Sequence, residues 1–127
     1  MLDQLRGMQL AVESPDHEEL LVHVAGRLTG ETGPRLERLL DRLSSRDGGT
    51  RARPSRMVVD LGNVWVYDRA GVAVLEQARY AAGKRGVRLV LGGVDAARLE
   101  LLPQRVEQTL RRLGTVAAPA AGRRSDG

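Results

Sequence analysis

The segment covering residues 57–91 constrains the fold more than any other part of the chain, because strand and helix patterns alternate along it. Residues 57–61 form a short apolar run, which is typical of a strand that is covered on both faces. Gly62 ends that run, and Asp68 is suited to cap a helix by accepting hydrogen bonds from its free N–H groups. A helical pattern follows, and residues 87–91 form a second buried strand. This order predicts two parallel strands joined by a right-handed crossover.

The part of the chain before this segment predicts a β-hairpin and a helix. Apolar and polar residues alternate over residues 8–12 and again over residues 20–25, and a turn-forming cluster separates the two runs. The short connection favours an antiparallel pair of strands. Thr32 is placed to cap a helix whose leucines fall on one stripe, and a polar loop follows over residues 44–55.

The part of the chain after the second buried strand allows two predictions. In the first, residues 95–102 and residues 103–113 form two helices, and no edge strand follows. In the second, an insertion precedes a helix at residues 106–114, and residues 115–117 add an edge strand to the sheet. The sequence does not decide between them.

Length and composition bound the class of protein. A chain of 127 residues has room for one domain, which we expect at residues 1–117, and the composition of residues 118–127 predicts a disordered tail. Cysteine is absent, so disulfides, thiolate zinc sites and cysteine nucleophiles are excluded. No apolar run approaches the roughly 18 residues of a membrane span, which predicts a soluble cytoplasmic protein without membrane insertion.

Charge and side-chain chemistry argue against nucleic-acid binding and catalysis. The net charge is +4, but the basic residues are spread among 16 acidic ones, and one Trp and two Tyr offer few stacking platforms for bases. His17 and His23 stand alone in the sequence, and Asp60 and Asp68 are more consistent with caps than with a catalytic pair. We therefore expect no enzyme, no metal, no cofactor and no nucleic-acid partner.

The order of these patterns resembles that of a STAS domain over about residues 8–94, and it is similar to the anti-sigma factor antagonists of bacterial partner-switching systems. The shared features are the hairpin, the G-x-L-x loop at residues 26–29, the V-V-D-L strand at residues 58–61, the D-x-x-G helix start at residues 68–71 and the R-G-V-R-L-V-L strand at residues 85–91. The resemblance implies an α/β fold with a mixed four- to five-stranded sheet, an N-terminal β-hairpin and helices packed mainly on one face.

In that family the helix start usually reads D-S-S-G, and its first serine is phosphorylated by an anti-sigma factor that is also a GHKL-type kinase. Here Arg69 stands at the acceptor position, Ala70 replaces the second serine, and Thr29 stands where the family often has Asp. Arginine has no hydroxyl and carries the opposite charge to phosphoserine, so the phosphorylation chemistry does not carry over. Arg69 also opposes the helix dipole. It either pairs with Asp68, with Glu31 or with a partner's carboxylate, or is simply solvated.

The resemblance places a partner-binding surface at the helix start, the segment before it and the G-x-L-x loop. The matching positions are Leu28, Thr29, Trp65, Val66, Tyr67, Asp68, Arg69, Ala70, Gly71 and Val74. Strand-like alternation predicts that the two aromatic residues among them face the same way, and we expect at least one of the two to be buried.

The function implied by the resemblance is that of a non-catalytic regulator. It would bind an anti-sigma factor or GHKL-type switch kinase without being phosphorylated, with a homodimer as a further possibility. The alternative is a STAS subunit of a transporter or of a larger signalling assembly, in which the domain has a structural role.

Overall fold

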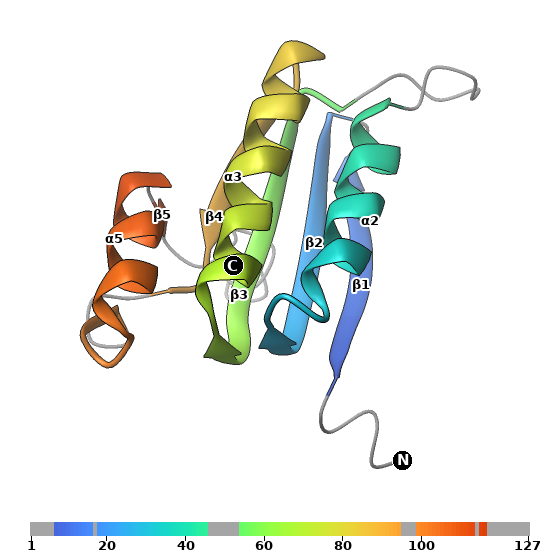
Figure 1. Ribbon diagram of the computed structural model, residues 1–127. Helices are drawn as coiled ribbons and strands as arrows, with labels where there is room; N and C mark the ends of the chain where they lie inside the picture. Colours follow the sequence, from blue (N-terminus) through green and yellow to red (C-terminus); the bar gives the residue numbers. More distant parts are fainter. Residues whose placement is uncertain (1–6, 17, 46–53, 95–98, 114, 117–127) are drawn as a thin grey trace, which may run out of the picture.

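The computed structural model describes residues 7–16, 18–45, 54–94, 99–113 and 115–116 (Figure 1). The elements in chain order are β1 (Met8–Asp16), β2 (Glu19–Leu28), α2 (Gly33–Ser45), β3 (Arg56–Tyr67), α3 (Arg69–Lys84), β4 (Arg88–Gly92), α5 (Gln104–Leu113) and β5 (Thr115–Val116).

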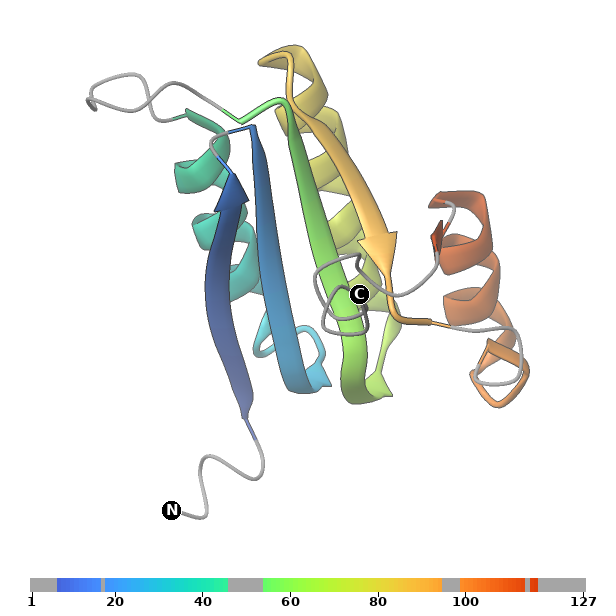
Figure 2. The same ribbon diagram turned by 180° about the vertical axis from the view of Figure 1, so that it is seen from behind.

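The five strands form one mixed sheet in the order β1-β2-β3-β4-β5. β1 pairs antiparallel with β2, and the remaining neighbours pair in parallel. Helices α2 and α3 lie on the same face of the sheet, and α5 stands beside β5 at the far edge of the sheet from β1 (Figures 1 and 2). The predicted α/β fold, with an N-terminal hairpin, a mixed sheet and helices mainly on one face, is confirmed.

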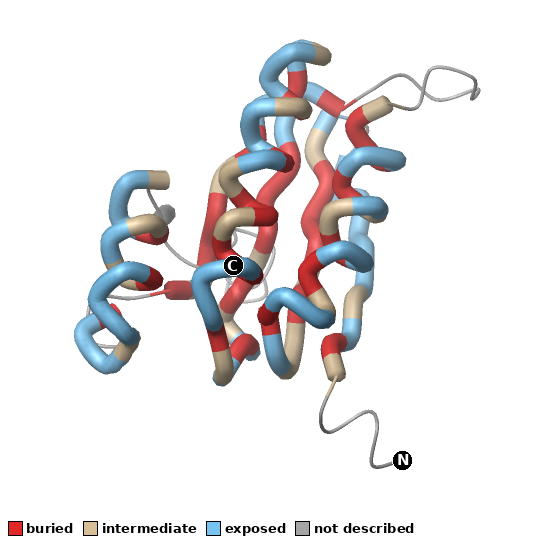
Figure 3. The backbone as a smooth tube through the Cα atoms, viewed as in Figure 1, coloured by how far each residue is buried: buried red, intermediate tan, exposed pale blue. Residues whose placement is uncertain are grey.

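The core lies between the sheet and the two central helices. Alternate residues of β2, from Leu20 to Val24, face the helices, and the leucine stripe of α2 meets them there. Leu75 of α3 is fully buried at the centre of this layer. In Figure 3 the strands are buried where the helices cross them, and the outer faces of the helices are exposed.

Strand β3 is longer than the sequence predicts. Gly62 does not end the strand, and the segment that was expected to be an apolar loop continues it to Tyr67. The pairing with β2 skips one residue of β3 between Asp60 and Asn63 and another between Val64 and Val66. Each skip is a bulge, which absorbs one extra residue and bends the strand while the ladder continues. The apolar character of this segment is therefore that of a strand.

The C-terminal part follows the second of the two predicted arrangements. Helix α5 leads into β5, which pairs in parallel with β4 as an edge strand. Leu99 and Glu100 are helical, but residues 95–98 of the expected short helix lie outside the described residues, as do Gly114, Ala117 and the predicted tail.

The end of α3 is closed by Gly86. Gly86 adopts a φ of +80°, a conformation that L side chains rarely adopt. Its N–H donates to the Gly83 carbonyl at 3.0 Å, and the Val87 N–H donates to the Ala82 carbonyl at 2.9 Å. These two bonds form a Schellman motif, which satisfies the last carbonyls of the helix and turns the chain into β4.

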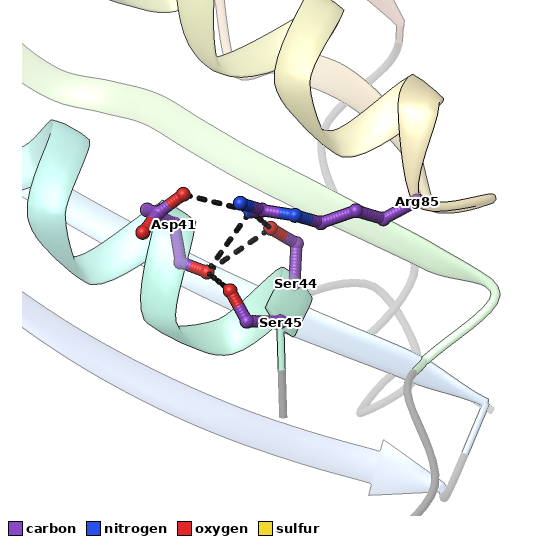
Figure 4. Close-up of polar contacts among 4 residues, drawn as sticks. All are labelled: Asp41, Ser44, Ser45 and Arg85. Carbon is purple, nitrogen blue, oxygen red and sulfur yellow. Dashed lines mark hydrogen bonds and ion pairs between the residues drawn. The ribbon is translucent and has the colours of Figure 1, made fainter. Parts of the chain in front are cut away.

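Arg85 ties this end of α3 to the last turn of α2, as Figure 4 shows. Its Nη1 lies 2.7 Å from Asp41 Oδ1 and 3.0 Å from Ser44 Oγ. The Ser44 hydroxyl is buried and also donates to the Asp41 carbonyl oxygen at 3.2 Å. One guanidinium therefore joins two helices that come from different βαβ units.

We expect Arg85→Ala to lower the free energy of unfolding by about 1 kcal/mol, because a partly exposed ion pair and a charge-assisted hydrogen bond are lost together. Urea unfolding followed by circular dichroism measures the change. The matched control is Arg42→Ala on α2, since Arg42 is exposed and forms no ion pair with the residues that the structure describes. Equal effects of the two substitutions would contradict a specific role for the Arg85 contact.

Candidate functional site

The end of β2 and the start of α3 meet at the carboxyl end of the sheet, and residues 26–28 of the G-x-L-x motif, which were predicted to be loop, belong to β2. Because β2 and β3 are parallel neighbours, their carboxyl ends lie side by side, with Leu28 in register with Tyr67. The Asp68 N–H donates to the Leu28 carbonyl oxygen at 3.2 Å, and the Gly33 N–H donates to the Thr29 carbonyl oxygen at 2.7 Å. Two segments about 40 residues apart in sequence therefore form one structural unit.

Asp68 holds both segments through its carboxylate. Oδ1 accepts from the Gly71 N–H at 2.7 Å, which is the predicted N-cap of α3. Oδ2 accepts from the Gly30 N–H of the other loop at 3.2 Å. The capping prediction is confirmed, and the structure adds that the same side chain positions the loop after β2.

Gly71 is required by the closeness of the two segments. A Cβ atom at this position would lie 2.2 Å from the Leu28 carbonyl oxygen and 2.8 Å from the Thr29 nitrogen. Gly33 is similarly close, because a Cβ there would lie 2.9 Å from Cγ2 of Val74. The chain approaching Gly71 is thus the protein's own loop, which packs directly on the first turn of α3.

The ten predicted partner-binding residues divide into an exposed set and a buried set. Trp65 is 70% exposed, Asp68, Arg69 and Ala70 are exposed, and Val66 is half-buried; we call these five residues the helix-start surface. The buried positions are Leu28, Thr29, Tyr67, Gly71 and Val74. The buried set frames the two loops, and the exposed set is what a partner can reach.

The bulges of β3 decide which aromatic residue is exposed. Tyr67 is only 7% exposed, and its hydroxyl donates to the Leu61 carbonyl oxygen at 3.5 Å, whereas Trp65 projects outward. The expectation that at least one of them is buried is confirmed, but the expectation that both face the same way is wrong. Simple alternation fails because the extra residue in the second bulge, between Val64 and Val66, shifts the strand's two-residue repeat.

The hydroxyl groups near Arg69 are engaged within the loop after β2. Thr29 is buried, and its Oγ1 accepts from the Glu31 N–H at 3.2 Å. Thr32 Oγ1 donates to the Arg27 carbonyl oxygen at 2.7 Å and accepts from the Thr29 N–H at 3.0 Å. Thr32 precedes α2 as predicted, but its hydroxyl stabilises the loop and does not cap the helix.

Arg69 is exposed in the first turn of α3 and forms no ion pair with the residues that the structure describes, so the suggested pairing with Asp68 or Glu31 is not observed. Its guanidinium lies at the positive end of the helix dipole. A carboxylate of a binding partner would be attracted both to the guanidinium of Arg69 and to the positive end of the helix dipole. The remaining expectation for this residue is therefore solvation or a partner's acidic side chain.

A cluster of ionisable residues that the sequence did not predict crosses β1, β2 and β3. His23 Nε2 lies 2.7 Å from Glu13 Oε1, and His23 Nδ1 lies 2.9 Å from Asp60 Oδ2. Both ring nitrogens face carboxylate oxygens, which favours the imidazolium form because both nitrogens then donate. The hydrogen bond to Glu13, with a further contribution from Asp60, raises the pKa of His23 above 6.5 against the opposing effect of partial burial.

This raised pKa predicts that stability falls as the pH rises. The folded state holds the His23 proton more tightly than the unfolded chain, so its contribution is complete below 6.5 and is lost as the pH passes the folded pKa. We expect the free energy of unfolding, measured by urea denaturation, to fall as the pH rises above 6.5 and through the raised folded pKa of His23. His23→Gln should remove most of this decline. Equal slopes in His23→Gln and in the unmodified chain would contradict the assignment.

Neither a membrane span nor a metal centre is found among the described residues. No helix there is long and apolar enough to cross a bilayer, and no group of three or more His, Cys, Asp or Glu side chains is arranged to hold a metal ion.

Several solved protein structures have a fold similar to that of this chain. No curated protein matches the chain. Its structure is similar to the anti-sigma factor antagonist SpoIIAA in its unphosphorylated form, with a TM-score of 0.67 and 11% identity over 93% of this chain and 95% of that chain. It is similar to an anti-sigma factor antagonist from Mycobacterium paratuberculosis, with a TM-score of 0.66 and 19% identity over 94% of both chains.

A similar domain also occurs inside a larger protein. The murine solute carrier 26 family member A9 anion transporter matches with a TM-score of 0.63 and 12% identity, over 94% of this chain but 22% of the transporter. At these identities the structural matches show a shared fold. The family model described as "Mlab, STAS domain" matches residues 11–115, which is most of the chain. The chain therefore belongs to the STAS domain family.

Proposed function

We propose that this protein is a regulatory binding domain that docks an anti-sigma factor or a related GHKL-type switch kinase through the helix-start surface, and that this docking is not switched by serine phosphorylation. The observation that carries the proposal is the joint exposure of Trp65 and Arg69. The indole of Trp65 is 70% exposed near the end of β3, and four positions later Arg69 is exposed and forms no ion pair with the described residues.

The chemistry of this surface suits a protein partner. Trp and Arg are the side chains that most often dominate protein–protein binding energy, since they combine large apolar area with directed hydrogen bonds. The surface rests on a rigid base, because Asp68 and Gly71 fix the two loops against each other. A rigid base lowers the entropy lost on binding.

The absence of a switch is supported by the hydroxyl positions around Arg69. The exposed first-turn positions carry Arg69 and Ala70, and the nearby Thr29 is buried. Thr32 already uses its hydroxyl as donor and acceptor within its own loop. A kinase would have to open that loop in order to reach either threonine.

The test is to incubate the full chain with candidate GHKL kinases and ATP, and to measure complex formation by calorimetry and phosphate incorporation by mass spectrometry. We expect binding without incorporation. Phosphorylation of Thr29 or Thr32 would overturn the unswitched part of the proposal. Failure to bind any such kinase would overturn the proposed partner class.

The variant Arg69→Ser, alone and combined with Ala70→Ser, tests whether the acceptor position is otherwise intact. We expect kinase-dependent phosphorylation to appear at residue 69, because a first-turn serine at this position would be exposed. The matched control is Arg69→Ala, which removes the same charge but supplies no hydroxyl. Incorporation in the alanine variant would show that the phosphate is placed elsewhere.

A second candidate function is a structural subunit of a transporter or of a larger signalling assembly. It is favoured by the occurrence of this fold as a minor part of the solute carrier 26 member A9 transporter chain. Affinity purification from the native cell separates the two functions. Recovery of the ATPase of an ABC transporter favours the second candidate, and recovery of a GHKL protein favours the first.

A further inference from the structure

A shallow groove runs between the outer faces of α3 and α5, away from the helix-start surface. It has a volume of about 490 Å³ and is lined by Glu76, Arg79, Tyr80, Gly83 and Lys84 from α3 and by Arg112 and Leu113 from α5. We call it the α3–α5 groove. The two helices that form it stand next to each other in Figure 1. Since Arg69 and Tyr80 are 11 positions apart on one helix, the two sites are separated by about 16 Å along its axis.

The charge of the groove is positive. Its lining holds three basic side chains and only one carboxylate, that of Glu76. Two of the guanidinium groups are held in place, because Arg79 Nη1 donates to the Leu113 carbonyl oxygen at 3.0 Å and Arg112 pairs with Glu76. Lys84 forms no ion pair with the described residues. A ligand that carries carboxylates would therefore meet an excess of positive charge.

An exposed aromatic ring gives the groove an apolar component. Tyr80 is 70% exposed, and the Lys84 ammonium lies 5.2 Å from the centre of its ring. Leu113 is half-buried on the opposite wall. A tyrosine beside a cation binds both an apolar side chain and a carboxylate at little cost in conformational entropy.

We propose that the α3–α5 groove binds an acidic segment of a partner protein, with carboxylates on Lys84 and Arg79 and an apolar side chain between Tyr80 and Leu113. A nucleic acid fits less well, because one tyrosine does not provide a row of stacking platforms for bases. This surface is a second binding site on the domain and does not depend on the partner of the helix-start surface.

Gly83 allows the charge of the groove to be changed without disturbing the fold. A Cβ atom at Gly83 meets nothing within 4 Å, so a side chain introduced there enters the open groove. The matched pair is Gly83→Glu and Gly83→Gln, which have nearly the same size and helix propensity and differ in one negative charge. Both replace a glycine in the last turn of α3 with a better helix former, so both variants should fold.

The probe is the heptapeptide Glu-Glu-Leu-Glu-Glu-Leu-Glu, titrated into the ¹⁵N-labelled full chain and followed by NMR. We expect saturable shifts in the second half of α3 and in α5, and no shifts at Trp65 or Arg69. Gly83→Gln should bind the peptide within about twofold of the unmodified chain, whereas Gly83→Glu should bind it at least about fivefold more weakly, because the added carboxylate repels the peptide.

Several outcomes would overturn this proposal. They are the absence of saturable shifts, shifts centred on the helix-start surface, or equal affinities of the two Gly83 variants. A single-stranded DNA oligonucleotide that binds the same residues more tightly than the peptide would assign the groove to nucleic acid instead. Because the Gly83 variants leave Trp65 and Arg69 unchanged, kinase binding in these variants tests the helix-start surface independently.

Discussion

Gly71→Ala is expected to lower the free energy of unfolding by about 3 kcal/mol, an unusually large effect for the addition of one methyl group. The new Cβ would lie 2.2 Å from the Leu28 carbonyl oxygen, which is backbone and has no rotamer by which to move away. The loop after β2 must then separate from the first turn of α3. The bonds from Asp68 to both segments would be weakened in the same step. Urea unfolding followed by circular dichroism measures the loss.

The matched control lies on the same helix. Gly83→Ala adds the same methyl group where nothing lies within 4 Å, so it should raise the free energy of unfolding by about 0.5–1 kcal/mol through helix propensity alone. Opposite signs for the two substitutions would confirm that close packing, and not a general effect of alanine in α3, requires glycine at position 71. A loss below about 1 kcal/mol for Gly71→Ala would contradict the packing of the two loops.

Trp65→Ala is expected to weaken binding of the partner of the helix-start surface by about 30-fold or more, which is about 2 kcal/mol or more. The indole is the largest exposed side chain on this surface, and its removal takes away the main apolar contact. The stability of the free protein should change by less than about 0.5 kcal/mol, since the ring is mostly exposed. Calorimetry with the co-purified partner gives the affinity, and urea unfolding gives the stability.

The control for this prediction is Leu101→Ala, which shortens another apolar side chain that is 85% exposed but lies far along the chain, in the loop before α5. It should leave the affinity unchanged. An unchanged affinity for Trp65→Ala would mean that the partner binds elsewhere. A large loss of stability in the same variant would mean that the indole packs against the domain and is not available as an anchor.

Features whose interacting residues lie close together in the sequence were predicted, and features that depend on distant residues were not. The hairpin, the helix after Asp68 and the strand at β4 were predicted because each is encoded by a local pattern of a few residues. The length of β3 was not predicted, because Gly62 acts as a break in an isolated strand but as a bulge in a strand that pairs with β2. The exposure of Trp65 depends on the same bulges, so the sequence did not predict it either.

The cluster of ionisable residues around His23 was not predicted for the same reason, because its members are far apart in the sequence. Asp60 within an apolar strand was a signal for a polar partner, but the sequence alone does not reveal that His23 is in register with Asp60 across two parallel strands. The positive α3–α5 groove was likewise not predicted, since Tyr80 and Arg112 come together only when α5 packs beside α3.

By itself, the sequence determined the order of strands and helices as far as β4, the cap at Asp68 and the replacement of the usual serine by Arg69, since each depends on neighbouring residues or on residue identity alone. Only the tertiary structure decided that Gly71 is packed against Leu28, that Trp65 faces outward and that β5 closes the sheet. These features depend on contacts between segments far apart in the chain, and such contacts form only when burial of the shared core outweighs the entropy of bringing those segments together.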